Sequence, residues 1–216
     1  MIHRPSRRGT HSFAAALVLA LVGGACSGSG GTAGPSVGPS VGPAGGDACP
    51  TSQPAPLAAG ETRTVTVTTS KGTITLQVDG DLSPIAAGNF VALASCGYYD
   101  GVAFHRVVPG FVIQGGDPTG TGSGGPGYTI QDEPVTTTYR RGTLAMARSS
   151  QPNSQGSQFF IVLADDAARA LASYNTYAIF GEVTAGMDAV DAIAAAADAE
   201  NPSNPIVMDA VTVAKP

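Results

Sequence analysis

Arg106 lies among apolar residues in a short strand-like run and is well suited to act on a ligand by hydrogen bonding. An arginine is permanently charged and holds several donors in a fixed plane. Gln114 and Gln158 also have apolar neighbours. Because buried amides are costly unless they are hydrogen-bonded, these residues indicate a polar site in an apolar setting.

Other chemistries find little support. His105 is the only histidine after residue 60 and has no visible nucleophile and orienting acid around it, so we interpret it as structural. The three cysteines and three histidines include no Cys-x-x-Cys or His-x-x-x-His pair, so no metal is expected. Gly120–Gly125 fits G-x-G-x-x-G, but Pro126 and Gly127 follow instead of a helix. We therefore expect no cofactor.

The charge balance argues against nucleic acid as a partner. The 216 residues carry 11 basic and 16 acidic side chains, a net charge of −5. From residue 61 onward there are 8 basic and 15 acidic residues, which gives −7. Nucleic-acid-binding domains normally carry the opposite sign.

Residues 1–26 are predicted to be an export signal, because a basic start precedes the apolar run Phe13–Val22. That run is too short for a permanent membrane span. Small residues followed by Cys26 resemble a bacterial lipoprotein signal, although Gly23 stands where leucine is usual. We expect an extracytoplasmic protein, anchored to the cell membrane by a lipid on Cys26 or, alternatively, cleaved near Ala25 and secreted.

Residues 27–60 are rich in Gly, Ser, Pro and Ala and hold one charged residue. Such a composition cannot bury enough apolar surface to order itself, so we predict a disordered linker. Cys49 and Cys96 remain once Cys26 is set aside. In an exported protein this pair can form a disulfide, and two free thiols are the alternative.

Residues 61–216 show the patterns of a mainly β domain. Pro84 suits the first turn of a helix, and residues 187–197 predict a second helix, whereas Asp165 and Asp166 are expected in a solvated turn. Eight short strand-like runs alternate or are bounded by Gly and Pro. They cover residues 62–69, 73–78, 102–108, 111–114, 142–148, 158–163, 176–183 and 206–213. This pattern predicts a closed eight-stranded antiparallel β-barrel capped by two α-helices.

Three sequence blocks carry a family resemblance. Residues 98–117 read YYDGVAFHRVVPGFVIQGGD, residues 142–161 contain GTLAMA and NSQGSQFFI, and residues 180–183 read FGEV. In this order and spacing they resemble the cyclophilin-type peptidyl-prolyl cis-trans isomerases, over about residues 64–213. The family fold is an eight-stranded antiparallel barrel with two helices, which agrees with the pattern above.

The resemblance implies a role for each matching residue. Arg106 would be catalytic, donating to the prolyl nitrogen as the X-Pro bond twists. Gln114 and Gln158 would hold the substrate backbone and support Arg106. The remaining substrate-binding candidates are Phe111, Val112, Gly122, Ala147, Arg148, Phe160, Leu171 and Tyr177.

Several of these positions depart from the family pattern. Val112 stands where Met is frequent, which predicts a slightly wider pocket, and Tyr177 stands where many members have His. Arg148 replaces a frequent Asn, which puts the substrate contacts there in doubt. Leu171 lies in a segment, residues 165–176, that aligns poorly.

Two functions remain open on the sequence. The first is an isomerase that acts on proline-containing peptides and unfolded exported proteins. The alternative is a non-catalytic module that binds proline-containing peptides at the cell surface. Arg106, Phe111, Gln114 and Phe160 favour the isomerase, whereas Arg148 leaves room for the module. In either case we expect a monomer.

Overall fold

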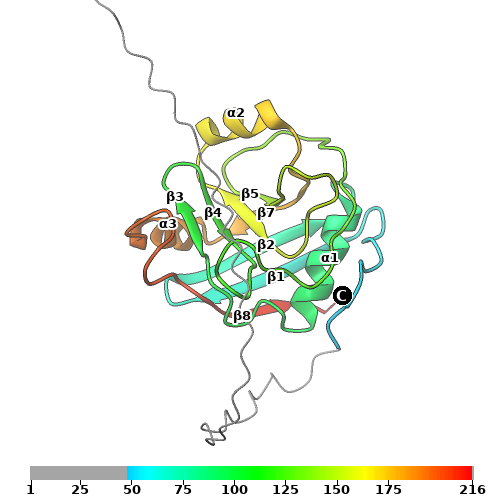
Figure 1. Cartoon of the computed structure of the whole chain (residues 1–216), viewed down its shortest axis with the longest axis horizontal. Helices are drawn as coiled ribbons and strands as arrows, with labels where there is room; N and C mark the ends of the chain where they lie inside the picture. The colour runs from blue at the N-terminus through cyan, green and yellow to red at the C-terminus, as the bar shows by residue number, and fades with distance from the viewer. Residues whose placement is uncertain (1–47, 216) are drawn as a thin grey trace, which may run out of the picture. The chain divides into compact units, whose positions relative to one another are not determined.

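The structure is a computed structural model that describes residues 48–215. The signal peptide and Cys26 lie outside the described residues. One antiparallel sheet of eight strands, in the order β3-β4-β6-β5-β7-β2-β1-β8, curls around the core (Figure 1). Its strands are β1 (Thr62–Thr69), β2 (Gly72–Asp79), β3 (Arg106–Val108), β4 (Val112–Gly115), β5 (Thr143–Met146), β6 (Phe159–Val162), β7 (Ile179–Ala185) and β8 (Met208–Val213).

The sheet is curled, but its strands do not pair into a closed ring. β3 and β8 are the two edge strands. The segment before β3 meets the start of β8 through an isolated bridge between Ala103 and Val207 and through neighbouring backbone hydrogen bonds, such as Met208 N–H to the Val102 carbonyl over 2.9 Å. The structure therefore shows eight antiparallel strands in a curled sheet, and the closure of the predicted barrel is not confirmed.

Three helices pack on the sheet, whereas the sequence analysis predicted two. They are α1 (Pro84–Ser95), α2 (Asp165–Tyr174) and α3 (Met187–Ala196). The expected turn at Asp165 and Asp166 is the first turn of α2, where acidic side chains favour the helix dipole. Ala167, Ala168 and Leu171 are its buried residues. Their helical spacing lets this short segment pack beside β6.

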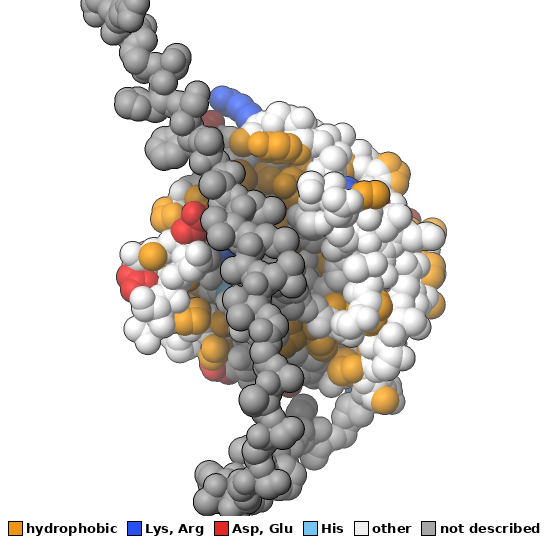
Figure 2. Space-filling model, viewed as in Figure 1, with side chains coloured by type: hydrophobic (Ala, Val, Ile, Leu, Met, Phe, Trp, Pro, Cys, Tyr) orange, Lys and Arg blue, Asp and Glu red, His pale blue; other side chains and the backbone are white. Residues whose placement is uncertain are grey.

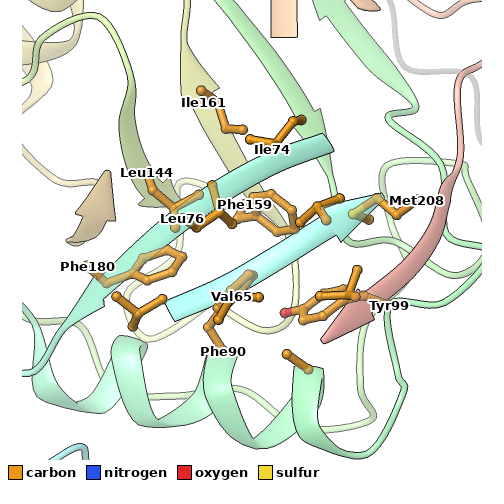
Figure 3. Close-up of a cluster of buried hydrophobic side chains, with 14 of the residues drawn as sticks. Val65, Ile74, Leu76, Phe90, Tyr99, Leu144, Phe159, Ile161, Phe180 and Met208 are labelled. Carbon is orange, nitrogen blue, oxygen red and sulfur yellow. The ribbon is translucent and has the colours of Figure 1, made fainter. Parts of the chain in front are cut away.

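Figure 3 shows the main core between α1 and the sheet. Phe90 of α1 lies 5.1 Å, between ring centroids, from each of Tyr99, Phe159 and Phe180. The Phe90–Phe159 pair is edge-to-face, a favourable aromatic geometry. This cluster anchors β6 through Phe159, and β6 carries Phe160 on its opposite face.

Part of the predicted linker belongs to the folded unit. Cys49 and Cys96 form a disulfide with 5.2 Å between their Cα atoms. Leu57 is buried and its N–H donates to the Pro84 carbonyl over 2.9 Å. Gly88 leaves room for this segment, because a Cβ there would lie 2.3 Å from the Ala55 oxygen. Residues 48–60 therefore cover α1 instead of spacing the domain from its surroundings.

Within the described range, none of the helices has the length and apolar character needed to cross a bilayer.

Candidate active site

A tight hairpin places Arg106 opposite Gln114. Pro109 and Gly110 form the turn between β3 and β4, and Gly110 has a φ of +71°, which suits glycine at this position. The Phe111 N–H donates to the Val108 carbonyl over 2.9 Å and closes the turn. The resulting register pairs Arg106 with Gln114.

A chain of hydrogen bonds runs from Arg106 across three segments. Arg106 Nη1 donates to Gln114 Oε1 over 3.4 Å, and Gln114 Nε2 donates to Gln158 Oε1 over 2.9 Å. Gln158 Nε2 donates to the carbonyls of Gly122 and Gly124, over 3.0 and 2.9 Å. Both glutamine amides are thereby oriented, and each donates away from Arg106. We call these three side chains the Arg–Gln relay.

The glycine-rich loop at the end of the relay is organised by Asp117. Its carboxylate accepts from the N–H groups of Thr119, Gly122 and Gly124 over 2.7, 2.7 and 3.0 Å. Burial raises the pKa of Asp117, but hydrogen bonds from the Thr119 hydroxyl and these N–H groups outweigh it and lower the pKa to about 2. The loop therefore supports Gln158 through its carbonyl groups.

An apolar pocket of about 230 Å³ opens beside Arg106. Phe160 and Tyr177 meet edge-to-face with ring centroids 5.4 Å apart and form one wall. Leu171 and Tyr174 enter from α2. The full lining is Arg106, Phe111, Val112, Gln114, Ala147, Arg148, Phe160, Leu171, Tyr174 and Tyr177.

A second cavity of about 770 Å³ adjoins the apolar pocket. The two share Gln114, Ala147 and Arg148 as lining residues. Gly122 and Gln158 line only the second cavity. All the predicted catalytic and substrate-binding residues therefore lie along one groove made of both cavities. On the face that Figure 2 shows, hydrophobic side chains gather near α2, and charged side chains are sparse.

Arg148 lines the groove, but its guanidinium is used elsewhere. Nη1 lies 3.0 Å from the Asp132 carboxylate, and Nη2 and Nε donate to the carbonyls of Gln151 and Ser149 over 2.8 and 3.2 Å. Asp132 also accepts from the Asn153 N–H over 2.8 Å. The side chain therefore holds the loop that borders the second cavity.

His105 lies beside the glycine-rich loop, near Gly122, with 6% of its surface exposed. Neither ring nitrogen has a hydrogen-bond partner among residues 48–215. Burial lowers the pKa of His105, against the opposing effect of Asp117. A buried imidazole without a hydrogen-bond partner agrees with a structural role.

Two contributors to the groove were missed by the sequence analysis. Tyr174 lines the apolar pocket with 66% of its surface exposed. The acidic residues 165 and 166 followed by Asn175, which adopts a left-handed conformation at the end of α2, were a usable signal for that helix. The sequence analysis quoted Asp117 only as the last residue of the family motif. Its role in organising the glycine-rich loop depends on how that loop folds back onto the Asp117 carboxylate.

Comparison with known proteins defines the class of this protein. The family model for cyclophilin-type peptidyl-prolyl cis-trans isomerases matches residues 64–213. The chain therefore belongs to this family, and it is a peptidyl-prolyl cis-trans isomerase. This assignment favours the isomerase over the non-catalytic module.

Individual relatives agree. The "Probable peptidyl-prolyl cis-trans isomerase A" of Mycobacterium leprae is 40% identical over 171 residues, which cover 69% of this chain and 91% of that protein. The isomerase of Synechococcus elongatus is 53% identical over 93 residues, which cover 43% of this chain and 63% of that protein. A cyclophilin-type isomerase of Cryptosporidium parvum, crystallised in the presence of the dipeptide Ala-Pro, is 34% identical with a TM-score of 0.63, covering 71% and 99% of the two chains.

Proposed function

We propose that this isomerase accelerates rotation of X-Pro bonds in exported proteins, with Arg106 stabilising the twisted amide. The observation that carries the proposal is the Arg–Gln relay, which holds a cation at the mouth of an apolar pocket. The pocket receives the proline ring, and the groove beyond it receives the preceding residues.

The chemistry follows from the amide bond. Resonance makes rotation slow, with a barrier of about 18–20 kcal/mol. Twisting the bond frees the nitrogen lone pair, so the prolyl nitrogen becomes a better hydrogen-bond acceptor midway. A fixed cationic donor therefore stabilises the twisted state more than either planar state. No covalent bond forms or breaks.

The pocket supplies the other half of the mechanism. Phe111, Val112 and Phe160 are apolar walls that bind the ring of proline without competing for hydrogen bonds. The Gln114 amide is already committed to Gln158, so Gln114 Oε1 stays oriented toward Arg106. The ring stays held while the preceding carbonyl rotates, which separates the moving part of the substrate from the fixed part.

We further propose that residues 1–26 direct export and that Cys26 carries a lipid anchor. The disulfide between Cys49 and Cys96 supports an oxidising compartment, where such bonds persist. Expression in a bacterium with labelled palmitate tests the anchor. Label in the membrane fraction that disappears in Cys26→Ser is the expected result. Unlabelled protein in the medium would establish secretion instead.

The mechanism is tested by NMR exchange spectroscopy on an X-Pro peptide with the purified chain and its Arg106→Ala variant. We expect a loss of about 100-fold or more in kcat/KM, in line with the loss of a preorganised donor. Equal acceleration by both proteins would refute the role of Arg106. Peptide binding without exchange in the parent protein would instead contradict catalysis itself.

A further inference from the structure

Arg106 has a second partner, which lies far away in the sequence. Its Nε donates to Glu200 Oε1 over 2.7 Å, and the two residues are 94 positions apart. The Arg106 side chain is 35% exposed and that of Glu200 is 57% exposed. Glu200 lies in the irregular segment between α3 and β8, outside every motif in the sequence.

Glu200 is held beside Arg106 by its own backbone. The N–H of Val107, the next residue in β3, donates to the Glu200 carbonyl over 2.7 Å. Because β3 is an edge strand, no neighbouring strand accepts a hydrogen bond from this N–H. Within the same segment, the Ser203 N–H donates to Asp198 Oδ1 over 3.0 Å. The carboxylate therefore meets Arg106 from a segment that is fixed to the same strand.

We propose that Glu200 is a positioning residue for the isomerase reaction, which fixes the guanidinium of Arg106 through Nε. The proposal rests on the catalytic role of Arg106 proposed above. Glu200 accepts a hydrogen bond from Nε, and Gln114 accepts one from Nη1. Nη2 has no acceptor within residues 48–215. Two anchors in one plane define the orientation of the whole guanidinium.

Orientation, not charge, is the effect that matters here. A long arginine side chain loses much rotamer freedom when it is held in one geometry, and Glu200 and Gln114 impose this loss before the substrate arrives. The opposing effect is that a carboxylate reduces the positive charge offered to the prolyl nitrogen. Water screens that effect, because the Glu200 side chain is 57% exposed. Positioning therefore outweighs the reduced charge, and Glu200 raises kcat.

The test compares Glu200→Ala and Glu200→Gln with the parent chain by NMR lineshape analysis over a range of X-Pro peptide concentrations. We expect Glu200→Ala to lower kcat by about two- to fivefold with KM unchanged, the range of an exposed ion pair. Glu200→Gln keeps an acceptor for Nε and recovers most of kcat. An unchanged or raised kcat in Glu200→Ala would overturn the proposal.

A matched control is Glu182→Ala, which removes the partly exposed Glu182–Arg140 ion pair. Glu182 lines neither cavity of the groove. Its substitution should leave kcat and KM as they are. An equal loss in Glu182→Ala and Glu200→Ala would mean that any such pair supports activity through stability alone, which also contradicts positioning.

A double-mutant cycle separates this inference from the proposed function. In the Arg106→Ala background, Glu200→Ala should have no further effect on kcat, because its partner is absent. If Arg106→Ala itself leaves kcat unchanged, the proposed mechanism fails. If Arg106→Ala is inactive but Glu200→Ala equals the parent, only the positioning role of Glu200 fails.

A spectroscopic measurement reports the contact directly. The Hε proton of Arg106 should exchange with water more slowly in the parent chain than in Glu200→Ala. Salt at about 1 M, where the screening length is about 3 Å, should lower kcat of the parent toward that of Glu200→Ala. It should leave kcat of Glu200→Ala itself unchanged. Equal Hε exchange in both proteins would show that the carboxylate does not hold the guanidinium in solution.

Discussion

Tyr139 and Tyr177 exchange hydrogen bonds through a single hydroxyl group. The Tyr139 hydroxyl donates to the Tyr177 carbonyl over 2.8 Å and accepts from the Tyr177 N–H over 3.2 Å. Tyr139 is 5% exposed, so water does not readily replace either bond. These two bonds fix the backbone of Tyr177, and the Tyr177 ring packs against Phe160 in the wall of the apolar pocket.

Tyr139→Phe keeps the ring and removes both bonds. We expect unfolding free energy to fall by about 1–3 kcal/mol, because two backbone groups lose their partner. We also expect KM to rise with kcat nearly unchanged, since the Arg–Gln relay is intact. Denaturant unfolding and peptide-exchange kinetics measure the two effects. A lower kcat at constant KM would show that this wall acts on the reacting bond itself.

Asp117 makes stability depend on pH in the acid range. Its pKa of about 2 in the folded state is below the value of about 3.9 for an unfolded aspartate. A lowered pKa stabilises the fold above the unfolded value, and this contribution is lost as pH falls from about 4 to about 2. The difference amounts to about 2.5 kcal/mol. Denaturant unfolding at several pH values should show this loss.

Asp117→Asn is the matched variant for that titration. It should be less stable than the parent at pH 7, and it should lack the parent's additional loss of stability below about pH 4. Its KM should rise, because the loop carbonyls that orient Gln158 are no longer held. Identical acid profiles in both proteins would show that other carboxyl groups carry the dependence.

Arg148 is expected to act through its loop and not through direct contact with substrate. Arg148→Ala leaves Asp132, 25% exposed in its side chain, without its cation. Unfolding free energy should fall by about 1–3 kcal/mol, and KM should rise for peptides that reach the second cavity. A dipeptide that occupies only the apolar pocket should keep its KM. Comparing a tetrapeptide with a dipeptide by NMR exchange checks this, and equal losses for both would place Arg148 at the proline itself.

The disulfide between Cys49 and Cys96 should stabilise the domain without serving catalysis. Neither cysteine lines the groove. Reduction frees a loop that spans 47 positions, which should cost about 2–4 kcal/mol in unfolding free energy. At room temperature kcat and KM should be retained. Thermal unfolding and exchange kinetics with and without reductant test this, and Cys49→Ser with Cys96→Ala is the reductant-free control.

The strands and the centre of the site were accessible from sequence because their determinants are local. Alternation of apolar and polar residues predicted some of the eight strands, and short runs bounded by Gly and Pro predicted the others. The Pro109–Gly110 turn sets the register that places Arg106 opposite Gln114. The same dependence on local pattern explains why the sequence analysis missed helix α2 and predicted a closed barrel. Helix α2 is short, and its only large apolar residues are Leu171 and the exposed Tyr174, so its pattern was weak. The edges of the sheet cannot be judged from any single strand.

The sequence by itself determined the eight strands, the family and the candidate catalytic and substrate-binding residues that line the groove. Only the tertiary structure decided what holds them. Glu200 meets Arg106 across 94 positions, and the Arg148 guanidinium turns to Asp132 instead of the groove. Such contacts arise from irregular segments whose paths are set by packing and by backbone bonds to other strands. No local spacing of residues records these paths, so the supporting contacts became visible only in the folded chain.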